Sequence, residues 1–352
     1  MNEQDQQLYN QFLQLVSISE NMQHRIISLE KANQVLVKSQ RQFTEWMDDT
    51  LDDLEHYQNN LYFEIMDSRN IKKPEEFWYP HIASREETME RLLRDHASIA
   101  RFGDGEFAVI QGRIRHKFQT VTDGQLAKRL KEVLDSDKKN MLIAIADNYG
   151  SLDQYTAQAK REIRHYMTRG VRREHLNLLR KDRIYYNAYI TRPYVMYADQ
   201  QTDAPAARFH QISQIWNGRD CIFIEGNKTG MGVGNQLFMN ARSIQRILAP
   251  AENAFSRYGQ ILDFSLKQPK DSLFLLALGP TASVLAYDLF QAGYQAVDIG
   301  HVDLEYEWFL KGEGHRTAVE GKYNNEIAGG ENTSAIEDQE YLRQVIADFS
   351  KI

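Results

Sequence analysis

The sequence predicts an α/β fold in which a mainly parallel sheet is covered on both faces by helices, preceded by an N-terminal helical coiled coil. From residue 97 onward, short apolar runs alternate with helical stretches, a rhythm typical of βαβ units. Before residue 62, apolar residues recur with a seven-residue period, and no glycine or proline interrupts them. The chain has 352 residues, of which 42% are hydrophobic, and this is enough for a sizeable core.

The N-terminal segment, residues 1–62, is predicted to be a coiled coil that joins copies of the chain as a parallel dimer. A helix is expected from about residue 6 to 62 because the first proline is Pro74 and the first glycine is Gly103. A polar Asn in such a seam often fixes the register of a two-stranded coil. The alternative is an amphipathic helix folded back on its own domain. The two series are Leu8, Leu15, Met22, Leu29, Leu36 and Phe43, and Phe12, Ser19, Ile26, Asn33, Gln40, Met47, Leu54 and Leu61.

Residues 63–83 are predicted to be a linker and residues 84–352 a second domain. Pro74 and Pro80 bracket an aromatic cluster in this linker. Ser84 and Glu87 then form a capping box that opens a helix over 85–96. Seven strands are expected at 98–102, 141–147, 183–189, 221–226, 243–249, 273–279 and 295–300, with intervening helices that include 124–135 and 281–293.

Polar residues follow the expected strands, at the edge where parallel sheets bind ligands. Asp104, Gly105 and Glu106 come after the first strand, and Arg192 follows the third. One interpretation of Asp-Gly-Glu is a common turn, and the other is a metal site on a strand-end loop. These residues alone leave both interpretations open.

The stretch 225–238 is rich in glycine and precedes an expected helix. Its glycines and Lys228 are suited to a bound phosphate, because glycine lets backbone N–H groups approach an anion. The spacing matches neither a Walker A loop nor the dinucleotide fingerprint, so a plain connection remains the alternative. Thr281 has two comparable interpretations, as a helix cap or as a phosphate contact.

Four polar residues follow the last expected strand and alternate with apolar ones: His301, Asp303, Glu305 and Glu307. In an extended chain all four share one face, and in a helix Asp303 and Glu307 still do. They form either a solvated edge or a site for a cation or a proton transfer.

Composition excludes several classes of protein. The net charge is −7 and the sequence pI is about 5.9, which argues against a nucleic-acid partner. The single cysteine, Cys221, permits no intrachain disulfide and fits a reducing compartment. Neither a signal peptide nor a membrane-spanning run is recognisable, so we expect a cytoplasmic protein.

Four ordered blocks resemble the bacterial glycosyltransferases of the GT-D fold, which act in adhesin glycosylation and use nucleotide sugars. The resemblance covers roughly residues 80 to 330 and leaves the coiled coil outside. The blocks are RFGDGEF (101–107), EGNKTGMGVGN (225–235), ALGPTASVLAYDL (277–289) and DIGHVDLEYEWF (298–309).

This resemblance implies a Rossmann-like domain that binds a UDP-sugar, with Asp104 and Glu106 holding Mn²⁺ or Mg²⁺ against the diphosphate. His301 is expected as a third ligand, and its imidazole would favour Mn²⁺. The implied activity is metal-dependent transfer of a hexose from a UDP-sugar to a hydroxyl of a protein-linked glycan on a surface adhesin. Glucose is the first candidate for this hexose.

Roles follow for the remaining candidates. Glu307 is the first choice for the general base and Asp303 the second. Two alternatives remain: a metal-dependent phosphohydrolase or nucleotidyltransferase that uses the same acids, and a non-catalytic coiled-coil adaptor that binds a nucleotide sugar. The candidate donor contacts are Arg101, Arg192, Lys228, Gly230, Gly232, Gly234 and Thr281.

Overall fold

The computed structural model describes residues 3–67, 78–114, 118–324, 326–327, 330, 333 and 336–351. The chain divides into two compact units, Met1–Ser68 and Arg69–Ile352. Pro74, expected in the linker, lies outside the described residues.

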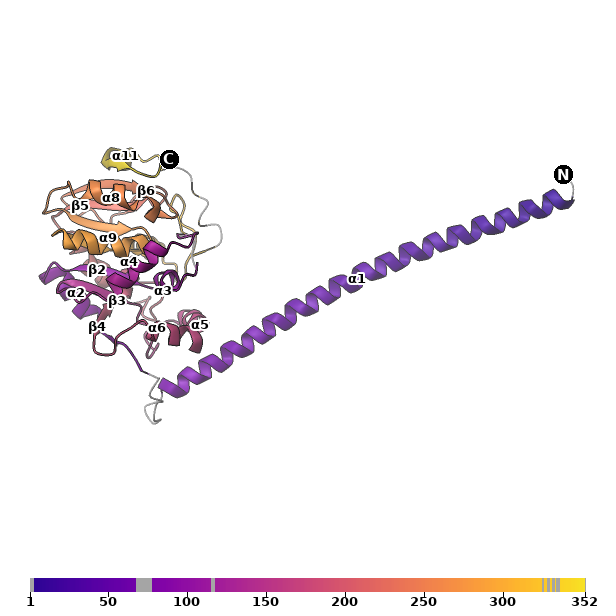
Figure 1. Ribbon diagram of the computed structural model, residues 1–352, viewed down its shortest axis with the longest axis horizontal. Coiled ribbons are helices and arrows are strands. Elements are labelled where there is room, and N and C mark those ends of the chain that lie inside the picture. Colours follow the sequence, from indigo (N-terminus) through magenta and orange to yellow (C-terminus); the bar gives the residue numbers. More distant parts are fainter. Residues whose placement is uncertain are drawn as a thin grey trace. The chain divides into compact units, whose positions relative to one another are not determined.

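The described part of the first unit is one helix, α1 (Glu3–Asp67), which confirms the helix expected over 6–62 (Figure 1). Its apolar seam is exposed wherever the side chains are described; Leu29 is 69% exposed and Leu36 is 67% exposed. An isolated helix with so much apolar surface in water gains stability from a partner surface. Neither α1 nor any other described helix is long and apolar enough to cross a membrane.

The second unit is built on a nine-stranded sheet whose described ladders are all parallel, in the order β1-β4-β3-β2-β8-β7-β5-β6-β9. The fold class expected from the sequence is confirmed, and all seven expected strands are present. The strands are β1 (His81–Ile82), β2 (Ser98–Phe102), β3 (Met141–Ile145), β4 (Ile184–Asn187), β5 (Asp220–Gly226), β6 (Ser243–Ala249), β7 (Leu273–Ala277), β8 (Gln295–Asp298) and β9 (Val345–Asp348).

Two edge strands were not expected from the sequence. β1 lies within the stretch 63–83 that was expected to be a linker, and it pairs with β4 about a hundred residues later. β9 pairs with β6 in the same way. Both are very short, and they are strands because a distant neighbour supplies their hydrogen bonds, which no local pattern reveals.

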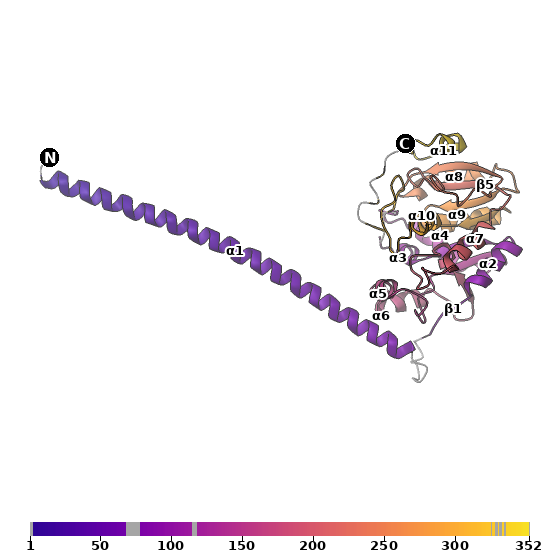
Figure 2. The ribbon, with the colours of Figure 1, turned by 180° about the vertical axis from the view of Figure 1, so that it is seen from behind.

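Helices cover both faces of the sheet, as Figures 1 and 2 show from opposite sides. Along β2 and β3 alternate side chains enter two separate cores: Ala100 and Ile143 enter one, and Ile99 and Leu142 enter the other. The first core is packed by α3 (Asp104–Ile110), α4 (Gly124–Leu134), α5 (Ala157–Tyr166), α6 (Arg169–Leu176), α8 (Tyr258–Ser265) and α9 (Pro280–Gln291). The second is packed by α2 (Arg85–Arg94), α7 (Ala204–Ser213) and α10 (Val302–Lys311).

The remaining described helical elements are α11 (Gln339–Gln344) and two 3₁₀ turns, Ala188–Thr191 and Ala254–Arg257. The expected capping box of α2 is confirmed, since Ser84 Oγ accepts from the Glu87 backbone N–H and Glu87 Oε2 accepts from that of Ser84.

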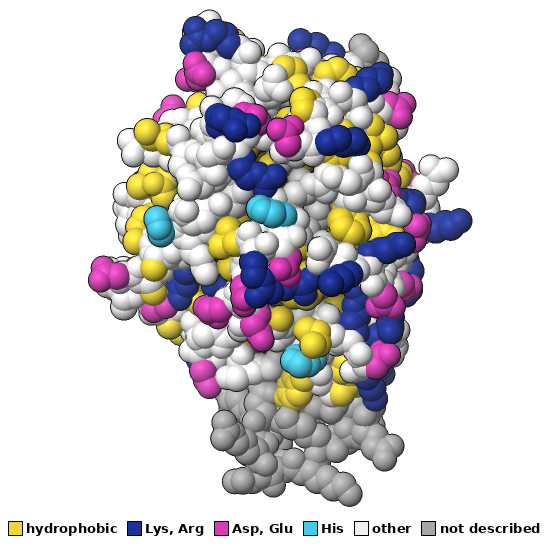
Figure 3. All heavy atoms as spheres, turned by 90° about the vertical axis from the view of Figure 1, so that its left-hand side faces the viewer, with side chains coloured by type: hydrophobic (Ala, Val, Ile, Leu, Met, Phe, Trp, Pro, Cys, Tyr) yellow, Lys and Arg dark blue, Asp and Glu magenta, His cyan; other side chains and the backbone are white. Residues whose placement is uncertain are grey.

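On the face seen in Figure 3, basic side chains cross the middle with acidic side chains directly beside them.

The helix expected after the glycine-rich stretch does not form. Residues 227–242 run through turns and enter β6 directly. Gly230, Gly232 and Gly234 have φ of 60°, 79° and 79°, and Met231 and Phe238 are buried in the second core. Left-handed glycines and inward-facing apolar residues thus hold this stretch as a folded loop rather than a helix.

Candidate active site

The candidate active site lies at the carboxyl ends of β2 and β8, where the strand order reverses. After β2 the chain enters α3 on one face of the sheet, and after β8 it enters α10 on the other. Ligands of parallel sheets bind in the crevice between two such diverging connections. Asp104 and Glu106 come from the first connection and His301 from the second.

Asp104, Gly105 and Glu106 form the first turn of α3, not the strand-end loop that we expected. Glu106 Oε2 accepts from the Gly103 backbone N–H at 2.8 Å, and Asp104 Oδ1 accepts from that of Gly105 at 3.0 Å. Carboxylates are stabilised here because the amino end of a helix carries partial positive charge. Burial, together with the charges of Asp298 and Asp104, raises the pKa of Glu106 to about 7.

Arg101, in β2, joins this strand to β8. Its Nη2 lies 2.8 Å from Asp298 Oδ1, its Nε donates to the Asp298 carbonyl oxygen at 3.0 Å, and its Nη1 donates to Thr191 Oγ1 at 2.8 Å. The guanidinium that we expected to contact a phosphate is therefore already occupied in joining the two strands.

Gly300 has to be glycine for this pairing. Its φ is +48°, and a Cβ there would lie 1.9 Å from Arg101 Nη2. We predict that Gly300→Ala lowers stability by about 1–3 kcal/mol, because it adds backbone strain and displaces the guanidinium. Thermal unfolding measures the loss. Gly293→Ala is the matched control, since its φ is +88° but its added Cβ would meet no atom within 4 Å; an equal loss in both would leave strain alone as the cause.

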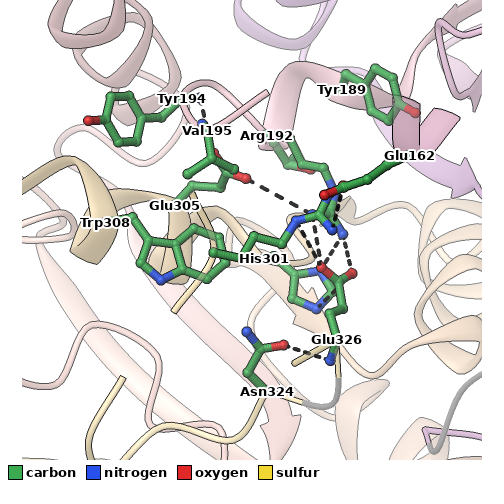
Figure 4. A network of polar contacts seen from close by, with 12 residues as sticks. Glu162, Tyr189, Arg192, Tyr194, Val195, His301, Glu305, Trp308, Asn324 and Glu326 are labelled. Carbon is green, nitrogen blue, oxygen red and sulfur yellow. Dashed lines mark hydrogen bonds and ion pairs between the residues drawn. The ribbon is translucent and has the colours of Figure 1, made fainter. Parts of the chain in front are cut away.

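Arg192, which follows β4 and the 3₁₀ turn Ala188–Thr191, lies at the centre of a polar network (Figure 4). It makes two hydrogen bonds to the Glu326 carboxylate, with 3.1 Å from Nη1 to Oε2 and a closer contact from Nη2 to Oε1, and Nη2 lies 3.2 Å from His301 Nδ1. Burial alone would raise the pKa of Glu326, but the charge of Arg192 holds it well below its usual range.

His301 is a neutral side chain in this network, because burial lowers its pKa to about 4. Since a guanidinium can only donate, His301 Nδ1 must accept from Arg192, and the ring proton is therefore on Nε2. Nε2 lies 3.6 Å from Glu326 Oε1. Neither ring nitrogen then offers a lone pair to a cation.

The helix α10 divides the four polar residues of 301–307 into two pairs. Glu305, fully buried, accepts from the backbone N–H groups of Tyr194 and Val195, each at 3.0 Å, and so lies on the side of His301 and Arg192. Asp303 and Glu307 lie on another side, as expected for a helix.

Asp303 and Glu307 are held by Lys322, a residue that the sequence analysis did not single out. Lys322 Nζ lies 2.7 Å from Asp303 Oδ2 and 2.8 Å from Glu307 Oε1, and its side chain is only 4% exposed. Asn235 Nδ2 donates to Asp303 Oδ1 and Glu307 Oε1, each at 2.7 Å. The cluster fastens the glycine-rich loop to α10 and to the segment that follows it.

In the loop 226–235, two backbone N–H groups that were expected to bind a phosphate donate to side chains of the protein instead. The N–H of Met231 donates to Glu225 Oε2 at 2.8 Å, and the N–H of Gly232 donates to Asp303 Oδ1 at 3.0 Å. Glu225 is itself paired with the buried Arg246. Protein carboxylates therefore satisfy two amides of this loop.

Lys228 and Thr281 differ in accessibility. The Lys228 side chain is exposed, while its carbonyl oxygen accepts from the Tyr323 N–H at 3.0 Å. Thr281 is buried in the first turn of α9, two residues after Gly279. A Cβ on Gly279 would lie 2.9 Å from Phe118 Cβ, so Phe118 covers the start of α9.

The expected metal set of three residues is not assembled: within the described ranges, no three His, Cys, Asp or Glu side chains gather to hold a metal ion. Of the three expected ligands, Asp104 and Glu106 still suit a metal ion. Their carboxyl groups interact, since the charge of Asp104 contributes to the raised pKa of Glu106. Two carboxylates suit Mg²⁺ or Mn²⁺, since such ions keep waters and take further oxygens from substrate phosphates.

Comparison with known proteins identifies the family. A family model described as "Glycosyltransferase GT-D fold" matches residues 99–327, well over half of the chain. The chain belongs to the GT-D-fold glycosyltransferase family. The expected family and enzyme class are thereby confirmed, and α1 lies outside the matched residues.

Two curated relatives are glycosyltransferases of streptococci. The GT-D-fold chain is 34% identical over 276 residues to the probable glycosyl transferase Gly of Streptococcus gordonii, and 31% identical over 267 residues to the glycosyltransferase GlyD of Streptococcus pneumoniae. The matches cover 77% and 74% of this chain but 39% and 32% of the relatives. The chain thus spans about a third of the length of these relatives.

Solved structures agree with the GT-D assignment. A new glycosyltransferase from Streptococcus sanguinis superposes with a TM-score of 0.71 at 33% identity, covering 77% of this chain and 100% of that one. A second structure, of domain of unknown function 1792 with a distinct glycosyltransferase fold, gives a TM-score of 0.70 at 33% identity and covers 77% and 96%.

Proposed function

We propose that this chain transfers a hexose from a UDP-sugar to a hydroxyl of a protein-linked glycan on a surface adhesin. Glucose is the hexose that we propose first. The observation that carries the proposal is the Asp104 and Glu106 pair at the start of α3, in the crevice where the strand order reverses. The relatives named as glycosyltransferases support the reaction class.

Asp104 and Glu106 would hold Mg²⁺ or Mn²⁺, which neutralises charge on the leaving diphosphate when bound. His301, whose ring nitrogens face Arg192 and Glu326, is left out of the proposed ligand set. Without an imidazole ligand, the donor atoms no longer favour Mn²⁺ over Mg²⁺.

Among the candidate donor contacts, Arg192, Lys228 and Thr281 are retained for the diphosphate. Lys228 is exposed and positively charged, and Thr281 lies in the first turn of α9, at the partly positive end of a helix beside β8. Arg101 and the amides of the glycine-rich loop are assigned to holding the site together, because their partners lie in strands and helices of the fold. The partner of Arg192, Glu326, lies in no described helix or strand.

The hydrogen bonds accepted by each carboxylate oxygen favour Glu307 over Asp303 as the general base. Both Asp303 oxygens accept hydrogen bonds, Oδ1 from Gly232 and Asn235 and Oδ2 from Lys322. Both contacts of Glu307 fall on Oε1, and no described residue donates to its Oε2. Glu307 thus keeps one oxygen available for an acceptor hydroxyl.

Incubation with UDP-glucose, Mn²⁺ and a defined glycan acceptor tests the proposal, with a mass increase of one hexose on the acceptor as the expected result. Donor hydrolysis that no acceptor redirects would favour the phosphohydrolase or nucleotidyltransferase alternative. Tight UDP binding without turnover on any acceptor would favour the adaptor.

We also propose that α1 pairs with a second copy as a parallel, in-register coil. With Phe12, Ile26 and Asn33 at the a positions of the heptad, Arg25 falls at g and Glu30 at the following e. In a parallel pair these two positions face each other across the helices. Opposite charges at Arg25 and Glu30 therefore favour this orientation and register.

Removal of α1 is predicted to separate the copies without unfolding unit two. A chain that begins near Pro74 should be monomeric in light scattering and should still bind UDP with metal, whereas the full chain should be a dimer. The shorter chain should also lose more activity on a multivalent protein acceptor than on a short glycan, since pairing raises effective concentration. A monomeric full chain would contradict the pairing.

A further inference from the structure

Arg192 binds an internal anion, the carboxylate of Glu326. Its side chain is 15% exposed, and its guanidinium makes two hydrogen bonds to the equally buried Glu326 carboxylate. Glu305 Oε1 lies farther away, at 4.0 Å from Nη1. The arrangement has the planar, two-pronged form by which arginine binds carboxylates and phosphates alike.

Two further nitrogen atoms face the same carboxylate without a hydrogen bond. His301 Nε2 lies 3.6 Å from Glu326 Oε1, and Arg316 Nε lies 3.8 Å from Oε2. Both nitrogens are buried and have no hydrogen-bond partner among the described residues. Buried donors are normally satisfied, so a two-oxygen carboxylate leaves this site incomplete. A diphosphate offers more oxygens over a larger volume.

The site is adjacent to the proposed metal pair. Arg101, three residues before Asp104, donates to Thr191 Oγ1 at 2.8 Å, and Thr191 directly precedes Arg192. The proposed phosphate site and the proposed metal pair are therefore connected through Arg101.

Glu326 lies outside the described helices and strands. Its backbone N–H donates to Asn324 Oδ1 at 2.9 Å, and Asn324 follows Lys322, which is fixed to α10. Lys322 is fixed, and Glu326 follows it in the chain. A ligand can therefore replace the Glu326 carboxylate without breaking a described sheet ladder.

We propose that Arg192, Arg316 and His301 form the binding site for the phosphate groups of a nucleoside diphosphate, and that Glu326 occupies this site as a stand-in until the ligand displaces it. The proposal rests on the proposed use of a UDP-sugar. Its consequence is that Glu326 lowers affinity for the donor, since every bound diphosphate must first replace an internal ion pair.

The test is calorimetric titration of the full chain with UDP, pyrophosphate and uridine in the presence of Mn²⁺. Glu326→Gln should tighten UDP and pyrophosphate binding about tenfold, within the usual range of coupling between linked sites, and should leave any uridine binding unchanged. Glu320→Gln is the matched control, because it removes the same charge from an exposed position of the same segment and should change nothing.

Arg192→Gln completes a double-mutant cycle. It should weaken UDP binding. In its background the gain in UDP affinity from Glu326→Gln should disappear, because the guanidinium for which Glu326 and the diphosphate compete is gone. Thermal unfolding of each variant checks that it folds. Unchanged or weaker UDP binding by folded Glu326→Gln would overturn the inference and leave the donor proposal intact. Absence of UDP binding in the wild-type chain would overturn both.

Discussion

Replacement of either Asp104 or Glu106 by alanine is expected to abolish the stabilisation that UDP confers in the presence of Mg²⁺ or Mn²⁺. Each change removes one of the two carboxylates proposed to join the ion to the protein. At a UDP concentration of about 100 times Kd, the wild-type chain should gain about 2.7 kcal/mol. This corresponds to a rise of roughly 4–5 °C in the melting temperature of unit two. Thermal unfolding with and without UDP and metal measures it.

Both acids also stabilise the first turn of a helix, so the control has to share that role. Glu86→Ala removes an exposed acid from the first turn of α2, a helix that carries neither Asp104 nor Glu106. It should lower stability slightly and keep the full response to UDP and metal. Normal metal-dependent UDP binding in both Asp104→Ala and Glu106→Ala would place the ion elsewhere.

Glu307→Gln is expected to retain affinity for the UDP-sugar and to lose most transfer activity. The amide preserves the shape and the hydrogen bond at Oε1 to Lys322 but cannot take a proton from the acceptor. Removal of a general base typically lowers the rate about 10²–10⁴-fold. The effect should appear in kcat and not in the KM for the donor, measured with saturating acceptor.

Asp303→Asn separates this role from the anchoring role of the cluster. Because both Asp303 oxygens are bonded within the protein, this change should lower the melting temperature and affect activity only through the loop that Asp303 holds. Full activity of Glu307→Gln would remove Glu307 as the base.

Much of the sheet is predictable from sequence because its strands are buried on both faces. β2 and β6 match the expected bounds, since each short apolar run ends in residues that favour a turn or a helix start. The glycine-rich loop was harder. Its sequence favours turns, but whether its amides face a ligand or the protein depends on Glu225 and Asp303, which lie in β5 and α10.

The candidate site shows the same limit at the level of side chains. Local spacing placed Asp104 and Glu106 after a strand, but their position in a helical turn depends on Gly103 and on packing of α3. Lys322 and Glu326 lie in a stretch with no periodic pattern. Their partners are Asp303, Glu307 and Arg192, and the last of these is more than 130 residues away in the chain.

Local sequence is therefore sufficient for the heptads of α1, the alternation of strands and helices, and the presence of acids at the strand ends, because these depend on periods of a few residues. The tertiary structure alone assigns partners to those acids. A helical period turns His301 and Glu305 toward Arg192, and Asp303 and Glu307 toward Lys322. Which cation meets which carboxylate depends on where distant segments cross, and long-range packing, not local propensity, fixes those crossings.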